Sequence, residues 1–121
     1  MASAILDSNI LIYYVAGFQL IPDLEMNVYA ISAVTVFELL RYPGLPEKEE
    51  RALLQAVGFC EVIPVSDTVA FRAALLNRIR DRDKKMDLLI ASTALELGIP
   101  LVTKNIKDFK NIPGLVVRST L

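Results

Sequence analysis

Three acidic residues of the 121-residue chain stand in segments that are otherwise apolar. They are Asp7 in Ile-Leu-Asp-Ser-Asn-Ile-Leu, Glu38 in Val-Phe-Glu-Leu-Leu and Asp87 in Met-Asp-Leu-Leu-Ile-Ala. A carboxylate buried among apolar side chains destabilises a fold unless it is paired, and a shared cation is the simplest partner for three of them. The chain has no His, so oxygen ligands would have to hold this cation. Oxygen ligands favour Mg2+ or Mn2+ over zinc.

Each of the three acids also has a purely structural explanation. Asp7 begins the run Asp-Ser-Asn, which contains three good helix N-cap residues. Thr35 and Glu38 have the spacing of a capping box, in which the glutamate reaches back to the threonine amide. Asp87 opens a helical segment, where a negative charge suits the helix dipole. Taken together, however, three such acids at one edge of a sheet would repel one another without a cation.

Length and composition predict one domain over residues 1–121. The chain is 54% hydrophobic with a mean hydropathy of +0.45, which predicts apolar surface and therefore an oligomer or a protein partner. The apolar run from 10 to 21 is interrupted and too short to span a bilayer. The N-terminus lacks a basic secretory start, and the single Cys60 cannot form an internal disulfide. We expect a cytoplasmic location, with Cys60 as a small buried apolar residue.

Short strands alternate with helices along the sequence. The strands are expected at Ala4–Leu6, Val28–Ile31, Glu61–Val65, Leu101–Thr103 and Leu115–Val117. The helices are expected from Ser8 or Asn9 to Val15, at Ser32–Tyr42 and Glu47–Val57, from Asp67 to about Arg82, and at Met86–Leu97. This alternation predicts an α/β fold, a three-layer α/β/α sandwich with a mostly parallel five-stranded sheet. Ligands of such sheets bind at the carboxyl ends of the strands.

A polar segment follows the fourth expected strand. Its sequence is Thr-Lys-Asn-Ile-Lys-Asp-Phe at 103–109. Asn105 offers a carbonyl oxygen and Asp108 a carboxylate, while the hydroxyl of Thr103 can hydrogen bond to a carboxylate that binds the cation. Because Asp7 ends the first strand at the same edge, this segment is expected beside it.

Four segments in this order resemble the motifs of PIN-domain ribonucleases and, more narrowly, of VapC-type toxins of bacterial and archaeal toxin-antitoxin pairs. They are residues 5–11, the helix that carries Glu38, residues 86–94 and residues 103–109, and the resemblance extends to Ile-Pro-Gly-Leu at 112–115. The resemblance implies a divalent-metal-dependent endoribonuclease on a PIN-like sandwich. It also implies that a cognate antitoxin holds the toxin inactive.

The resemblance further assigns roles to individual residues. Asp7, Glu38, Asp87 and Asp108 correspond to the family's catalytic acids, which with Asn105 would bind one or two Mg2+ or Mn2+ ions. The hydrogen-bonding residues around these ligands would be Thr103, Ser8 and Asn9. The family often has an acid where this chain has Asn105, so a second metal site here would be weaker or would rely on Asp108. Catalysis by a single metal ion stays open.

The chemistry follows from these ligands. A bound Mg2+ or Mn2+ lowers the pKa of its water for in-line attack on an RNA phosphodiester, and Glu38 is an alternative general base. The net charge of −1 argues against strong nonspecific nucleic-acid binding. Basic residues nevertheless gather next to the proposed metal site, and we expect them to contact RNA phosphates: Arg78, Arg80, Arg82, Lys84, Lys85 and Lys104.

Three alternatives stay open at this stage. A phosphoacceptor signalling domain on a similar sheet would need two adjacent acids after the first strand, where this chain has one. A catalytically inert PIN-like module that binds RNA or protein is compatible with Asn105. A PIN nuclease in RNA processing would have no antitoxin.

The N-terminal half contains more apolar side chains than one core face can use, namely Ile12, Tyr13, Phe18, Leu20, Ile21 and Leu24. In the resembling toxins this half forms a groove for an antitoxin peptide, and the subunits pair. We therefore expect a homodimer that also accepts an amphipathic partner segment.

Overall fold

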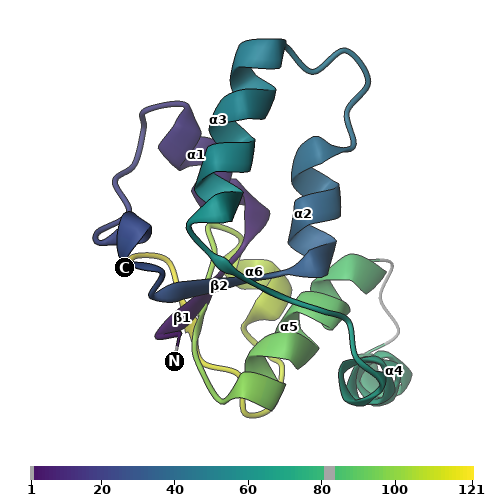
Figure 1. Cartoon of the computed structure of the whole chain (residues 1–121). Helices are drawn as coiled ribbons and strands as arrows, with labels where there is room; N and C mark the ends of the chain where they lie inside the picture. The colour runs from purple at the N-terminus through teal and green to yellow at the C-terminus, as the bar shows by residue number, and fades with distance from the viewer. Residues whose placement is uncertain (1, 81–83) are drawn as a thin grey trace.

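The structure, a computed structural model, describes residues 2–80 and 84–121. It has five strands, β1 Ala4–Leu6, β2 Tyr29–Ser32, β3 Glu61–Ile63, β4 Leu101–Val102 and β5 Val117–Arg118. The helices are α1 Ser8–Val15, η1 Leu24–Met26, α2 Ala33–Leu40, α3 Glu47–Gly58, α4 Asp67–Arg80, α5 Lys85–Leu97 and α6 Ile106–Phe109. The α/β class and the three-layer arrangement are confirmed (Figure 1).

The sheet is parallel throughout, with strand order β3-β2-β1-β4-β5. The chain first adds strands on one side of β1 and then crosses to add β4 and β5 on the other side. The point where the order reverses therefore lies between β1 and β4, where Leu6 is paired with Val102. Asp7 and Thr103 directly follow these paired residues, so the register brings them together at the edge where such sheets bind ligands.

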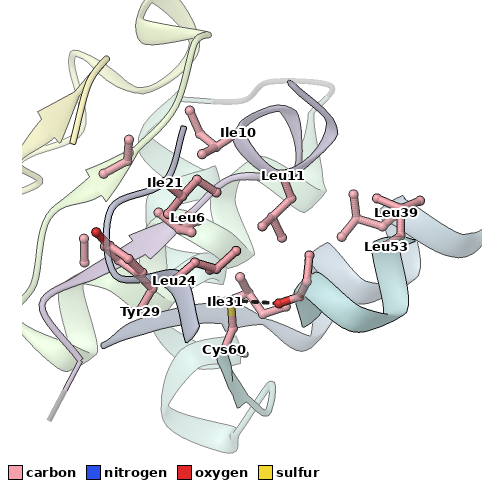
Figure 2. Close-up of a cluster of buried hydrophobic side chains, with 13 residues drawn as sticks. Leu6, Ile10, Leu11, Ile21, Leu24, Tyr29, Ile31, Leu39, Leu53 and Cys60 are labelled. Carbon is pink, nitrogen blue, oxygen red and sulfur yellow. Dashed lines mark hydrogen bonds between the residues drawn. The ribbon is translucent and has the colours of Figure 1, made fainter. Parts of the chain in front are cut away.

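Two apolar clusters pack on the opposite faces of the sheet. Because side chains alternate along a strand, Leu6 of β1 points into one cluster and Ile5 into the other. The first cluster packs under α1 and α3 (Figure 2). The second packs under α4 and α5, which lie on the other side of the sheet in Figure 1. Both faces are thus covered, as a parallel sheet requires.

Cys60 belongs to the first cluster, as the sequence predicts. Its thiol donates to the carbonyl oxygen of Ala56 at 3.5 Å (Figure 2), and burial raises the pKa of the thiol to about 11. A thiol with so high a pKa stays protonated at neutral pH and is a packing group rather than a nucleophile.

Several expected boundaries are wrong. The last strand lies two residues later than predicted at its start, at Val117–Arg118, and α2 ends at Leu40 rather than at Tyr42. The short helices η1 and α6 were not predicted, because segments of three and four residues carry no helical periodicity. The end expected for α4 at about Arg82 lies outside the described residues. No helix in residues 2–80 or 84–121 has the length and apolarity needed to cross a membrane.

The surplus of apolar surface lies partly where the sequence predicts it, since four of the six named side chains are exposed: Ile12, Tyr13, Phe18 and Leu20. Ile21 and Leu24 are instead buried in the first cluster, because the irregular segment after α1 folds back over the sheet. A further apolar row, not predicted from the sequence, lies on α4. Phe71, Leu75 and Ile79 are spaced four residues apart, and their exposed fractions are 73%, 54% and 74%. This spacing puts them on one face of α4.

Candidate metal and nuclease site

Asp7 lies at the carboxyl end of β1 with only 4% of its surface exposed. It is the N-cap of α1: its Oδ1 accepts a hydrogen bond from the Ser8 N–H at 2.8 Å. Its Oδ2 accepts from the Thr103 hydroxyl at 2.7 Å and from the Asn9 amide at 3.3 Å. The capping interpretation of Asp7 is therefore correct. Capping does not use all the acceptor capacity of the carboxylate, because Oδ1 accepts one hydrogen bond and has a second lone pair that could face a cation.

The contacts around Asp7 continue across the point where the strand order reverses. The Thr103 hydroxyl, which donates to Asp7, accepts a hydrogen bond from the Asn105 N–H at 3.0 Å. The side-chain oxygen Oδ1 of Asn9 accepts a hydrogen bond from the backbone N–H of Lys104 at 3.1 Å. Hydrogen bonds thus link the residues that follow β1 to the residues that follow β4. These bonds fix the orientation of the Asp7 carboxylate.

Burial raises the pKa of Asp7 above its usual value of 3.8. The hydrogen bonds from Thr103, Ser8 and Asn9 oppose this rise, because they stabilise the ionised form, and the nearby charge of Asp108 adds to it. A carboxylate with little access to water and a second carboxylate nearby favours the approach of a cation.

Glu38 projects from the last turns of α2 and is half-buried. Its Oε1 is buried without a hydrogen-bond partner. Burial first, and then the charges of Asp7 and Asp87, raise its pKa from 4.5 to about 7, with opposing contributions from Arg41 and the Ser8 hydroxyl. Glu38 therefore shares an electrostatic environment with both other acids, as the sequence predicts for converging carboxylates.

The capping-box interpretation of Glu38 is wrong. Helix α2 begins at Ala33, and its N-cap is Ser32, whose hydroxyl accepts from the Val34 N–H at 3.0 Å. Glu38 consequently lies in the second half of the helix, and Thr35 is buried within it, its hydroxyl oxygen without a hydrogen-bond partner. Helix capping does not explain the carboxylate.

Asp87 lies in the first turn of α5, where its charge also suits the helix dipole. It lines a pocket of about 380 Å³ together with Glu38, Asn105 and Asp108. Asn105 precedes α6, and its side chain makes no capping hydrogen bond. Asp108, in α6, accepts a charged hydrogen bond from the Lys84 ammonium at 2.7 Å. Acids from α2, α5 and α6 thus face one pocket beside Asp7.

In their present positions, no three acidic side chains in the described part of the chain form a group that could hold a metal ion. The donors are nevertheless of the right kind, since all are carboxylate or amide oxygens. The unpartnered Glu38 oxygen and the raised pKa of Glu38 indicate a local lack of positive charge. A hard divalent cation fits this need, and holding one would require the carboxylates to turn toward each other.

Only some of the predicted RNA-binding residues line the pocket of the candidate site. Lys84 and Lys85 line the pocket. Lys104 is exposed, but its ammonium donates to the Ser119 carbonyl oxygen at 3.0 Å, and Arg78 is exposed on α4 without lining the pocket. The side chain of Arg80 and the whole of Arg82 lie outside the described residues.

Sequence reasoning missed Arg41, which also lines this pocket. Its position three residues after Glu38 could have indicated that it lies near Glu38, since residues spaced by three lie near one another along a helix.

Comparison with known proteins agrees with this fold. The family model of the PIN domain matches residues 4–115. The chain is 29% identical to the ribonuclease VapC2 of Rickettsia felis, with 94% of this chain and 95% of that protein covered. It is also 29% identical to the tRNA(fMet)-specific endonuclease VapC of Shigella flexneri, covering 95% of this chain and 96% of that protein.

A solved structure gives the same result. The VapBC2 complex of Rickettsia felis, bound to a DNA fragment from its promoter, contains a chain that is 28% identical and superposes with a TM-score of 0.82. The match covers 95% of this chain and 96% of that one. Family model, relatives and structure thus agree over nearly the whole length, and the chain belongs to the PIN-domain family.

Proposed function

We propose that the chain is a divalent-metal-dependent endoribonuclease and the toxin of a type II toxin-antitoxin pair. The observation that carries the metal site is Glu38, whose buried Oε1 has no partner and whose pKa is raised to about 7 beside Asp7 and Asp87. Membership of the PIN family and two relatives named as a ribonuclease and an endonuclease support nuclease activity.

Asp7, Glu38 and Asp87 would hold the first Mg2+ or Mn2+ ion, and Asp108 and Asn105 would contribute to a second. When bound, such an ion activates water and offsets the negative charge of the phosphodiester. The hydrogen bonds from Thr103, Ser8 and Asn9 restrict the Asp7 carboxylate at the carboxyl end of β1.

Glu38 is suited to proton transfer as well as to metal binding. In the metal-free protein, a carboxyl with a pKa of about 7 accepts and releases protons at neutral pH, and a cation bound nearby would lower this pKa. Its unpartnered Oε1 is the atom that would take the proton of the attacking water. The assignment predicts that Glu38→Gln lowers the cleavage rate more than it lowers metal affinity.

RNA is the proposed substrate, and the Shigella flexneri relative, by its name, acts on tRNA(fMet). That tRNA is therefore the first substrate to assay. The purified chain should cleave it with Mg2+ or Mn2+ and lose this activity in EDTA. Asp87→Asn should abolish cleavage, whereas the matched control Asp23→Asn should not. Asp23 is exposed and has a left-handed backbone that Asn tolerates.

Cleavage that continues in EDTA would reject the metal mechanism. The absence of cleavage with either metal, across tRNA, rRNA and mRNA substrates, would instead favour the inert RNA- or protein-binding module.

An antitoxin partner is supported by the solved relatives, which are toxin-antitoxin complexes from Rickettsia felis and Klebsiella pneumoniae. A suitable surface is an apolar groove of about 320 Å³ between α1, α2 and α3. Its lining is Ile12, Val15, Ala16, Leu39, Tyr42, Leu45, Glu49 and Leu53. An amphipathic helix could place its apolar face there. A saturating protein product of the neighbouring reading frame should stop cleavage, and an unchanged rate would reject that protein as the antitoxin.

A further inference from the structure

The pocket of the candidate site contains both signs of charge. Its acids are Glu38, Asp87 and Asp108, and its bases are Arg41, Lys84 and Lys85. Acids alone would repel an RNA phosphate. The proposed cation offsets this repulsion at the bond that is cut, and a basic residue of the pocket could receive a neighbouring phosphate. The contacts that each base already makes decide which one is suited to that role.

The two lysines are already engaged within the protein. The Lys84 ammonium is 2.7 Å from the Asp108 carboxylate. The Lys85 ammonium donates to the Asn77 side-chain oxygen at 3.0 Å. A phosphate would have to compete with these contacts for either lysine.

Arg41 is placed differently. It makes no ion pair within 4 Å with any residue in 2–80 or 84–121, yet it lies close enough to Glu38 to oppose the rise of that residue's pKa. Its guanidinium lies over the ring of Tyr42, 5.1 Å from the ring centre. This contact restricts the Arg41 side chain. One guanidinium nitrogen also donates a long hydrogen bond to the Tyr42 hydroxyl, at 3.5 Å.

We propose that Arg41 is the phosphate-binding residue of this site and that it receives an RNA backbone phosphate next to the bond that is cut. This inference rests on the proposed ribonuclease function. A guanidinium can give two parallel hydrogen bonds to one phosphate, which an ammonium cannot. Arg41 follows α2 directly, so its distance from Glu38 is set by the same helix. Arg41 is thus a positioning residue, and the acids remain the groups that act on the reacting atoms.

The test measures RNA binding separately from cleavage. Asp87→Asn protein, which should bind RNA without cutting it, is titrated into a fluorescein-labelled, mixed-sequence single-stranded RNA. The RNA has roughly twelve nucleotides, a length that spans several phosphate contacts. Fluorescence anisotropy is recorded at several KCl concentrations. Arg41→Ala should weaken binding about tenfold at low salt, and it should reduce the slope of log Kd against log salt by roughly 0.7, the value for one phosphate contact to a single strand. Arg41→Lys should restore the slope but only part of the affinity, because the charge returns without the planar fork.

Arg51→Ala is the matched control. Arg51 is exposed on α3 and pairs with Glu47, away from the pocket, so its loss should change neither the affinity nor the slope by more than about twofold. Far-ultraviolet circular dichroism should be the same for all variants. The Mn2+ affinity, measured by calorimetry on the same Arg41 and Arg51 variants with Asp87 intact, should also be unchanged.

Binding by Arg41→Ala within twofold of the parent, or equal weakening by Arg51→Ala, would overturn the role of Arg41 and leave the nuclease proposal intact. A protein with Asp87 intact that neither binds nor cleaves RNA would overturn the proposed function and this inference with it.

Discussion

Replacing Glu38 by Gln should stabilise the metal-free protein by an amount that grows as pH rises from 4.5 and is complete above about pH 7. The folded protein keeps the Glu38 proton up to a pKa of about 7, whereas the unfolded chain releases it near 4.5. Between these values the folded state binds more protons, so the free energy of unfolding falls as pH rises from 4.5 to 7 and is level above that. Gln cannot ionise and therefore avoids this loss.

The size of the effect follows from the same pKa. A shift from 4.5 to about 7 corresponds to roughly 3 kcal/mol at 1.4 kcal/mol per tenfold change in proton affinity. Glu38 is only half-buried, so solvent screening reduces the expected gain to about 1–2 kcal/mol at pH 8. At pH 4.5 the parent and the variant should have nearly equal stability.

Urea denaturation in EDTA at pH 4.5, 6 and 8 measures this difference. Glu61→Gln is the control, because Glu61 is exposed on the edge strand β3, and it should show no comparable rise between pH 4.5 and 8. Adding Mn2+ at pH 8 should stabilise the parent more than Glu38→Gln. A Glu38→Gln protein that is no more stable than the parent at pH 8, or equally stabilised at pH 4.5, would refute the idea that burial and the charges of Asp7 and Asp87 disfavour the ionised form of Glu38.

Three further outcomes are expected. Asp7→Asn should keep the metal-free stability within about 1 kcal/mol, since Asn is an equally good N-cap, and should abolish cleavage; Asp7→Ala should unfold in less urea because the cap and its partners are lost. Lys84→Met should tighten Mn2+ binding by about two- to fivefold in calorimetry, because the ion would no longer compete with Lys84 for Asp108, and a partly exposed ion pair is worth up to about 1 kcal/mol. An unchanged affinity would show that Lys84 does not compete with the ion. If the protein pairs through the apolar row on α4, Leu75→Glu should shift it from dimer to monomer in light scattering; a parent that is already monomeric would reject the predicted homodimer.

The sequence was sufficient for the features that depend on long patterns. Alternating strands and helices predict the parallel sheet, and the position of Asp7 at the end of its first strand predicts the edge where the acids gather. The PIN resemblance rested on short motifs in the right order, and the family model matches the same chain.

The details that failed depend on tertiary contacts. Thr35 and Glu38 have capping-box spacing. In the structure, however, β2 ends at Ser32 and α2 begins at Ala33, two residues before Thr35. Ile21 and Leu24 belong to a segment without periodicity, so nothing in the sequence indicates that it folds back over the core. Arg41 could not be separated from other exposed basic residues until the pocket was known.

The position of the bound cation tests the central claim most directly. Crystals of the chain soaked in MnCl2 can be measured at the manganese absorption edge, where anomalous scattering locates the ion. We predict a peak in contact with carboxylate oxygens of Asp7 and Asp87, beside Glu38, and no such peak in Asp87→Asn. Protein that cleaves RNA in the same buffer but shows no manganese at these acids, or shows it elsewhere, would contradict this assignment of the site.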